Sequence, residues 1–340
     1  MREKITEYLR LFRIQYIGIL GTIPVIGALS TGIQDIESIL CIFIIGFFQY
    51  TYLFVSNDVI DIKLDQQSQQ VKIRPLAKGA ISKKTGILIS VLCVIIVYIL
   101  SFLFFYKNHI TFTYALICLT SACILGTINN VYGKKFASSA IIAGIAQGLI
   151  IPYAAFLVSN NIDLSYLTIV ISLLVFNQIL FTTGVSGPLK DSDHDYKQKV
   201  RNYATITGVR VDEKDNSLFI PNGFKILGMG IRFSSMLLVF LTIFYFKFDY
   251  EFWQVFLILF FSMVVLLTTI KMFDFKNYNR DQLRKNIIVQ IIFRSTLIQL
   301  LLFPVFGTIN TLALVLFTFS CYIISIETMK LLNCSRKYYG

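Results

Sequence analysis

Runs of about 20 mainly apolar residues recur along the whole chain, separated by short polar segments. A helix of this length crosses the hydrocarbon core of a bilayer, where each backbone polar group must be paired within its own segment. Of the 340 residues, 56% are hydrophobic and only 15% are charged, which is more apolar residue than a soluble domain can bury. The sequence therefore predicts an all-α, polytopic membrane protein.

The apolar runs define ten expected transmembrane helices in one domain that spans residues 1–340. Only Pro304, Gly307 and Asn310 mark the break between the last two runs. We expect spans at residues 14–31, 38–57, 86–106, 111–130, 138–158, 165–187, 226–246, 253–273, 287–305 and 309–331.

Three carboxylates stand at the end of the second apolar run. Asp58, Asp61 and Asp65 follow Asn57 at positions i, i+3 and i+7, so a continuing helix places all three on one face. Burying several carboxylates at a membrane edge costs free energy unless a cation lies between them. This spacing indicates a cation site.

A second acidic cluster follows a later apolar run in the same way. It comprises Asp191 and Asp195, with Asp193 between them. Mg²⁺ prefers oxygen ligands and commonly bridges one or two carboxylates to substrate phosphates. Two such clusters facing each other at one membrane edge would hold Mg²⁺ and a polyanionic substrate.

Basic residues accompany both clusters. Arg can fork onto phosphate oxygens, whereas Lys acts more as a point charge. The cations expected near a phosphate are Lys72, Arg74, Lys78, Lys134, Lys135, Lys190 and Lys197.

The distribution of the net charge of +12 excludes a nucleic-acid role. Lys and Arg are concentrated in alternate loops, which is the positive-inside pattern of membrane proteins. This pattern predicts that both termini and the acidic-motif loops, residues 57–85 and 188–225, lie on the cytoplasmic side. We expect an integral protein of a bacterial plasma membrane, in contact with the lipid bilayer.

These motifs resemble those of the UbiA superfamily of intramembrane prenyltransferases. The first signature is Asn57-Asp58-x-x-Asp61-x-x-x-Asp65 followed by Arg74-Pro75-Leu76-x-x-Gly79-x-Ile81-Ser82. Asp191-x-x-x-Asp195 with a downstream Thr205 is similar to the second signature, and Tyr132 with Lys134 and Lys135 to the basic third motif. The likeness in layout spans roughly residues 10–275.

The resemblance implies a helical bundle, usually of nine transmembrane helices, around a central cavity. With the runs above, it gives nine or ten helices. Members bind a prenyl diphosphate through Mg²⁺, the diphosphate leaves, and the allylic cation alkylates a small acceptor, often an aromatic ring. Carried over, the metal ligands are Asp58, Asp61, Asp65, Asp191 and Asp195. The substrate-binding residues are Asn57, Lys72, Arg74, Tyr132, Lys134 and Lys190, and Lys135 joins the carboxylates as a catalytic residue.

Three matters stay open at this level. The family's third motif has Tyr and Lys four residues apart, whereas both lysines lie closer to Tyr132 here, so either can take the role. A terpene cyclase of the same superfamily would use the same ionisation step without an acceptor. A transporter that holds a cation with its carboxylates is the non-enzymatic alternative.

Three further patterns lie within the apolar runs. Arg294, with Gln290 and Gln299, is an intramembrane ionisable residue, which is either functional or a structural hydrogen-bond donor. Arg232 lies near a helix start, from which its side chain can extend toward the cytoplasm. Gly144 and Gly148 form a small-xxx-small pair, which predicts close helix packing.

Overall fold

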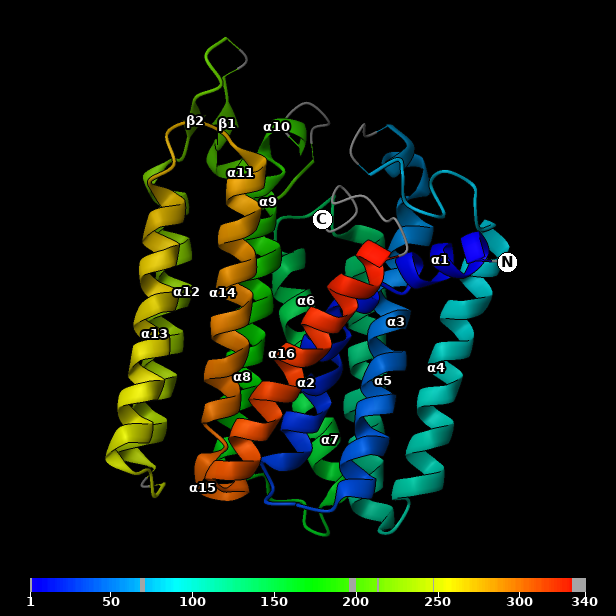
Figure 1. Ribbon diagram of the computed structural model, residues 1–340, viewed down its shortest axis with the longest axis vertical. Helices are drawn as coiled ribbons and strands as arrows, with labels where there is room; N and C mark the ends of the chain where they lie inside the picture. The colour runs from blue at the N-terminus through cyan, green and yellow to red at the C-terminus, as the bar shows by residue number, and fades with distance from the viewer. Residues whose placement is uncertain (1, 68–70, 196–199, 213, 247, 332–340) are drawn as a thin grey trace. The chain divides into compact units, whose positions relative to one another are not determined.

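The computed structural model describes residues 2–67, 71–195, 200–212, 214–246 and 248–331 (Figure 1). The chain forms two compact units. One contains the described residues of 1–117, 153–163 and 312–340, and the other those of 118–152 and 164–311. Both units are almost entirely helical, as expected for an all-α membrane protein.

The first unit is built around three neighbouring helices, α2, α3 and α4. Its elements are α1 (Arg2–Leu11), a 3₁₀ turn (Ile14–Tyr16), α2 (Ile17–Leu29), α3 (Ile36–Gln67), α4 (Lys83–Phe105), the start of α5 (His109–Tyr132), most of α7 (Ile150–Val158) and most of α16 (Thr308–Leu331). Gly46 permits the close crossing of α2 and α3, since a Cβ there would lie 2.5 Å from the carbonyl oxygen of Gly21.

The second unit pairs α6 with α8, α8 with α12, and α13 with α14. Its long helices are α6 (Ser139–Gly148), α8 (Tyr166–Phe181), α12 (Asn222–Phe240), α13 (Phe252–Phe273) and α14 (Arg280–Leu300). Its short elements are π-helical turns at Thr182–Ser186 and Leu241–Tyr245, α9 (Gly187–Lys190), α10 (Ser192–Asp195), α11 (Tyr203–Thr207), β1 (Arg210–Val211), β2 (Leu218–Phe219) and α15 (Phe303–Phe306). The predicted close packing at Gly144 is confirmed, because a Cβ there would lie 2.8 Å from the Phe176 ring.

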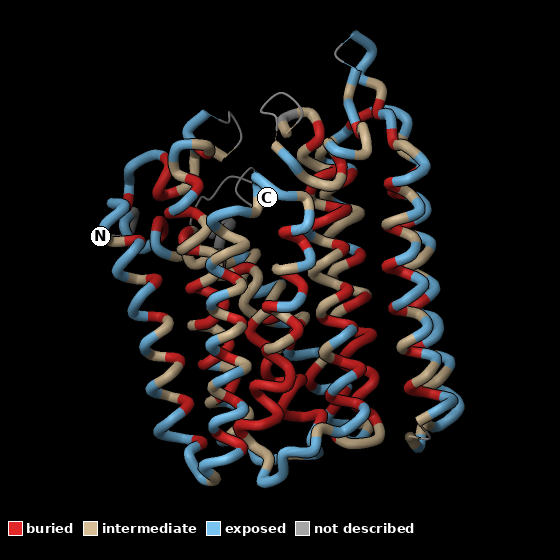
Figure 2. The backbone as a smooth tube through the Cα atoms, turned by 180° about the vertical axis from the view of Figure 1, so that it is seen from behind, coloured by how far each residue is buried: buried red, intermediate tan, exposed pale blue. Residues whose placement is uncertain are grey.

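Nine of the ten expected spans correspond to helices that could cross a membrane. Among the described residues, eight helices are long and apolar enough, and a ninth span results if the bent pair Lys4–Leu11 and Ile14–Leu29 counts as one. Large apolar side chains such as Phe256 and Phe260 are exposed on α13, and exposed positions recur along the length of that helix (Figure 2). A lipid environment accommodates such a surface. The chain is an integral membrane protein.

The one expected span without such a counterpart among the described residues, 287–305, is helical but too polar to count as a membrane span. It corresponds to α14, which ends at Leu300, and the predicted break follows at Pro304 and at Gly307, where φ is +79°. The polar side chains Gln290, Arg294 and Gln299 are all buried. They lower the mean hydropathy of α14 although they lie on its inward face.

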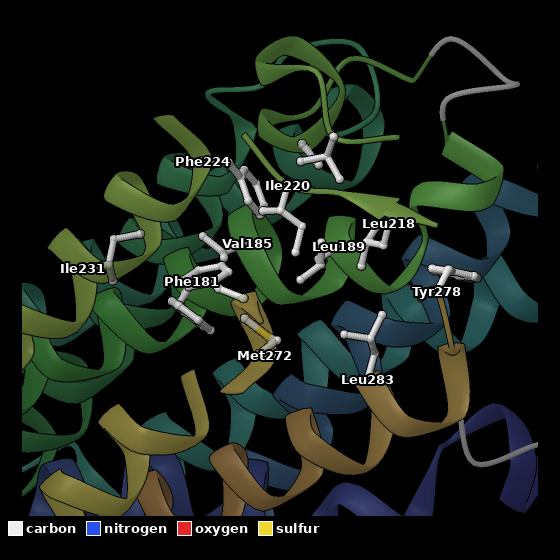
Figure 3. Packing of buried hydrophobic residues seen from close by; sticks show 13 residues of the cluster. Phe181, Val185, Leu189, Leu218, Ile220, Phe224, Ile231, Met272, Tyr278 and Leu283 are labelled. Carbon is white, nitrogen blue, oxygen red and sulfur yellow. The ribbon is translucent and has the colours of Figure 1, made fainter. Parts of the chain in front are cut away.

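The described part of the second acidic-motif loop, residues 188–225, contains regular secondary structure. Its strands β1 and β2 pair antiparallel, with Arg210 opposite Phe219, and the loop adds short helices α9 to α11. A buried cluster that includes Leu189, Leu218, Phe224 and Leu283 joins this loop to the ends of α12 and α14 (Figure 3). Burial of these side chains fixes the backbone that carries the second acidic cluster.

Candidate active site

The first acidic cluster lies on the last turns of α3, which continues as a helix well past its apolar run. Asp58, Asp61 and Asp65 are 2%, 9% and 5% exposed, so all three carboxylates are buried. The predicted helical spacing is confirmed by α3, which extends to Gln67. Asn57, the residue before the cluster, is half-buried.

Arg74 neutralises two of these carboxylates. Its Nη1 donates to Asp65 Oδ2 at 2.9 Å and to Asp58 Oδ1 at 3.2 Å. Burial alone would lower the pKa of Arg74, but the neighbouring carboxylates outweigh it and raise this pKa above its usual value. The guanidinium therefore stays charged beside the acids.

The Arg-Pro-Leu segment owes its position to apolar anchors. Leu76 and Ile81 are buried in a cluster with Leu11 and two valines of α3. Between the anchors, the chain turns at Gly79, whose φ of +78° belongs to the left-handed region that glycine adopts without strain. The buried Leu76 and Ile81 and the turn at Gly79 thus hold the loop against α3, where Arg74 reaches the carboxylates.

We expect Leu76→Ala to destabilise the protein by about 3 kcal/mol, because the change leaves a cavity in this cluster. The same variant should weaken binding of the prenyl diphosphate that the family resemblance implies, since Arg74 would lose its anchor. Thermal unfolding and prenyl diphosphate binding measure the two effects. Leu92→Ala is a suitable control, because Leu92 is exposed on α4. A stable Leu76→Ala protein would show that the cluster does not hold the loop.

Arg13 is a cluster residue that the sequence reading missed. Its Nη2 donates to Asp58 Oδ1 at 2.6 Å, and its guanidinium lies 4.4 Å above the centre of the Phe54 ring. Its own backbone is left-handed, with φ 48°, and its carbonyl oxygen accepts from the Tyr50 hydroxyl. An arginine at φ above zero is uncommon and is stabilised here by these contacts. No motif in the sequence links Arg13 to Asp58, which is 45 positions away.

The second acidic cluster has its own arginine, which the sequence reading also missed. Arg280, the first residue of α14, donates from Nη2 to Asp191 Oδ1 at 2.5 Å. Lys190 Nζ lies 3.7 Å from Asp191 Oδ2. Lys190 thus lies beside the cluster, although Arg280 is closer to Asp191, and its role in substrate binding stays a prediction.

Asp195 is held by an amide rather than by a guanidinium. Its Oδ2 accepts from Asn202 Nδ2 at 2.7 Å, and Asn202 in turn forms a reciprocal cap with Thr205 at the start of α11. Thr205 therefore orients Asn202. Burial, and then the charge of Asp191, raises the pKa of Asp195 to about 7. Such a carboxyl gains by binding a cation.

Asp193 is tied to the loop before α14. The Tyr278 hydroxyl lies 2.8 Å from Asp193 Oδ1 and 2.5 Å from the carbonyl oxygen of Lys190. Burial, followed by the charge of Asp193, raises the pKa of Tyr278 well above its usual value. The phenol therefore stays neutral and serves as a hydrogen-bond donor.

The two lysines of the third motif have different surroundings. Lys134 is close enough to Asp195 to lower the pKa of that carboxyl, and its carbonyl oxygen accepts from the Arg201 backbone. Lys135 Nζ instead lies 5.3 Å from the centre of the exposed Tyr132 ring. The contacts favour Lys134 over Lys135 as the cation of the second cluster.

We expect Lys134→Met to lower kcat/KM for a prenyl diphosphate by about tenfold and Lys135→Met by less than about twofold, because only Lys134 lies near an acidic cluster. Steady-state release of diphosphate measures both, and each variant is the other's control. A larger loss in Lys135→Met would reverse the assignment.

The remaining expected residues are more exposed. Lys72 is exposed in the loop of Arg74, and Lys78 Nζ lies 2.9 Å from Glu7 Oε2 on α1. Lys197 and the C-terminal residues 332–340 lie outside the described residues. Within the part of the chain that the structure describes, no three His, Cys, Asp or Glu side chains are grouped to hold a metal ion by themselves.

The profile of the UbiA prenyltransferase family matches residues 19–220, which is more than half of the chain and includes both acidic clusters. The chain belongs to this family. None of the curated proteins compared with this UbiA chain matches it.

Solved structures have the same fold as this UbiA protein. A digeranylgeranylglyceryl phosphate synthase aligns with a TM-score of 0.61 and 19% identity over 89% of this chain and 99% of its own. A UbiA homologue from Aeropyrum pernix K1 aligns with a TM-score of 0.60 and 13% identity over 91% and 97%. A homologue from Archaeoglobus fulgidus, bound to GPP and Mg²⁺, aligns with a TM-score of 0.60 and 14% identity over 86% and 99%.

Proposed function

We propose that this UbiA protein is a Mg²⁺-dependent intramembrane prenyltransferase. It transfers the prenyl group of an allylic prenyl diphosphate to a small acceptor, and an aromatic ring is the acceptor class that the family resemblance implies. The observation that carries this proposal is the pairing of buried carboxylates with two arginines at the end of α3. The family membership and the relatives bound to DMAPP or GPP with Mg²⁺ support it.

The donor set at the end of α3 fits Mg²⁺. All three carboxylates are buried oxygen donors, which is the ligand type that this ion prefers. A protein cage of three acids is not required, because Mg²⁺ usually keeps water and takes its other ligands from substrate phosphates. Asp58, Asp61 and Asp65 would hold it, and the predicted role of Asp191 and Asp195 as further ligands is part of the proposal. Bound Mg²⁺ would neutralise charge on the leaving diphosphate.

The chain's own cations bind and orient the diphosphate. Arg13 and Arg74 each donate to the acids through a single nitrogen, and a guanidinium carries five N–H donors. The remaining N–H groups can donate to phosphate oxygens, and Asp58 keeps both guanidinium groups in place. Lys134 and Arg280 offer positive charge at the second cluster. Charge that develops on the diphosphate as the allylic C–O bond breaks is stabilised by these donors.

Arg13 belongs to this machinery although it stands outside the recognised motifs. It shares Asp58 with Arg74, so the two guanidinium groups are held on one carboxylate oxygen. Two cations kept together against their repulsion favour a ligand with several negative charges. A diphosphate has that property.

Release of diphosphate by the purified protein in nanodiscs tests the proposal. Dimethylallyl, geranyl, farnesyl and geranylgeranyl diphosphate are supplied with Mg²⁺ or with EDTA, with and without aromatic acceptors. Organic extracts are then analysed by mass spectrometry. The expected result is Mg²⁺-dependent release together with an acceptor that gains the mass of one prenyl unit.

Other outcomes of the same assay exclude the transferase. A terpene formed without acceptor would identify a cyclase, which uses the same ionisation. Absence of both turnover and Mg²⁺-dependent binding of any prenyl diphosphate would contradict the enzyme assignment and favour a transporter.

A further inference from the structure

Two buried arginines of the second unit have no acidic partner. Arg232 of α12 and Arg294 of α14 are 2% and 1% exposed. Neither forms an ion pair among the described residues. The predicted extension of Arg232 toward the cytoplasm is wrong, because its side chain is held inside by Thr269, Gln290 and the Phe181 ring.

The contacts of both guanidinium groups are to neutral atoms. Arg232 donates from Nε to Thr269 Oγ1 at 3.0 Å and from Nη2 to Gln290 Oε1 at 2.6 Å. Arg294 donates from Nη2 to the carbonyl oxygen of Leu174 at 3.1 Å and to Ser235 Oγ at 3.0 Å. These hydrogen bonds satisfy some donors and leave the charges uncompensated.

One nitrogen of each guanidinium has no hydrogen bond. Nη1 of Arg232 and Nη1 of Arg294 are both buried and lack a partner in the described structure. A buried donor on a charged group is costly to leave unpaired, and more so when a second like charge is close enough to repel it. The arrangement calls for an acceptor that carries negative charge.

Both arginines line one pocket between α12, α13 and α14, which run side by side in Figure 1. Ser235 and Ser262 add hydroxyl groups, and the other lining residues are apolar, such as Val239 and Val265. Ser262 is the middle residue of α13, so the pocket lies deep within the span. Its volume of about 20 Å³ is enough for a small ion and too small for a diphosphate.

The surrounding helices offer no carboxylate to this pocket. Helices α8, α12 and α13 contain no Asp or Glu, and α14 has only Asp281 in its first turn. The negative charge must therefore come from outside these helices. We propose that the pocket binds one small monovalent anion, a halide or a small carboxylate, between Arg232 and Arg294. The site lies between α12, α13 and α14, and α8 contributes the Leu174 carbonyl oxygen that accepts from Arg294. It is independent of the proposed prenyl transfer.

Thermal unfolding of the full-length protein in detergent tests the site without any assay of activity. Sodium gluconate, whose anion is too large for the pocket, is replaced stepwise by chloride or by formate at constant ionic strength. We expect a saturable rise in Tm of about 3 °C. A response to chloride alone identifies a halide site, and a response to both anions identifies one that also takes carboxylate. Equal Tm values in all three salts would overturn the proposal.

Gln290→Glu is the decisive variant, because it places a carboxylate beside Arg232. We expect a higher Tm than wild type in gluconate and loss of the anion-dependent rise. Gln290→Met is the matched control. It removes the same amide without adding charge, so it should lower Tm and keep the anion dependence. Arg210→Gln, which removes an exposed arginine, should behave as wild type. A Gln290→Glu protein that still responds to chloride as wild type does would contradict the proposed site.

Discussion

Asp58→Asn should lower kcat/KM for a prenyl diphosphate by about 100- to 1000-fold, and Asp191→Asn should have an effect of the same order. Asn keeps the shape and one acceptor oxygen of Asp but loses the charge that a divalent cation and two arginines require. Asp58 is the more informative position, because its Oδ1 accepts from both Arg13 and Arg74. Steady-state diphosphate release at saturating Mg²⁺ measures the effect.

The control for Asp58→Asn is Glu37→Gln, which removes an exposed acid from the first turn of the same helix, α3. That variant should retain wild-type activity. Membrane insertion and Tm must be measured for each variant, because Asp58→Asn also leaves two guanidinium groups without a full counter-charge. Full activity in both Asp58→Asn and Asp191→Asn would refute the metal-assisted mechanism.

The apolar runs predicted the spans well because hydropathy reports what lipid requires of a helix. They gave the wrong end or the wrong polarity for a helix where its polar side chains are buried and do not face lipid. Helix α3 continues beyond the expected end at residue 57, since carboxylates neutralised by arginine remain compatible with helix. In α14 the polar residues face inward, so an average over all faces underestimates how well the helix packs.

The site was predictable to the extent that its residues are close in sequence. The helical spacing of Asp58, Asp61 and Asp65 needs no tertiary information, and the first signature supplied Arg74. The contacts of Arg13 with Asp58 and of Arg280 with Asp191 join residues 45 and 89 positions apart. No local pattern records such pairs.

The difference between Lys134 and Lys135 shows a second limit of sequence. Lys134 and Lys135 are adjacent in the sequence just after α5, yet Lys134 interacts with Asp195 whereas Lys135 Nζ lies over the Tyr132 ring. The same holds for Arg232. The expected span 226–246 put Arg232 near a helix start, whereas α12 begins at Asn222 and Arg232 lies in its middle. The Phe181 ring, whose centre is 3.4 Å from the guanidinium, belongs to a separate helix.

Arg74→Gln is the second change for which we expect a large effect, a loss of about 30- to 100-fold in kcat/KM, mainly through a higher KM. Arg74 bridges Asp58 and Asp65 through a single Nη1, so its other N–H groups can donate to the diphosphate of the proposed substrate. Arg74→Lys should recover only part of the loss. An ammonium restores the charge but not the fixed fork of N–H donors that binds phosphate oxygens in pairs.

Comparison of the three side chains at position 74 separates charge from geometry. If charge alone matters, Arg74→Lys will match wild type, and the arginine will be a counter-ion for the acids and no more. If the fork matters, Arg74→Lys will lie between wild type and Arg74→Gln in KM for each prenyl diphosphate, whatever its chain length. Arg210→Gln, which removes an exposed arginine, controls for the loss of one positive charge.

Arg13 donates to the same Asp58 oxygen as Arg74. The double variant Arg13→Gln with Arg74→Gln should therefore lose less kcat/KM than the product of the two single losses. Independent effects of the two changes would mean that the arginines do not act on one diphosphate.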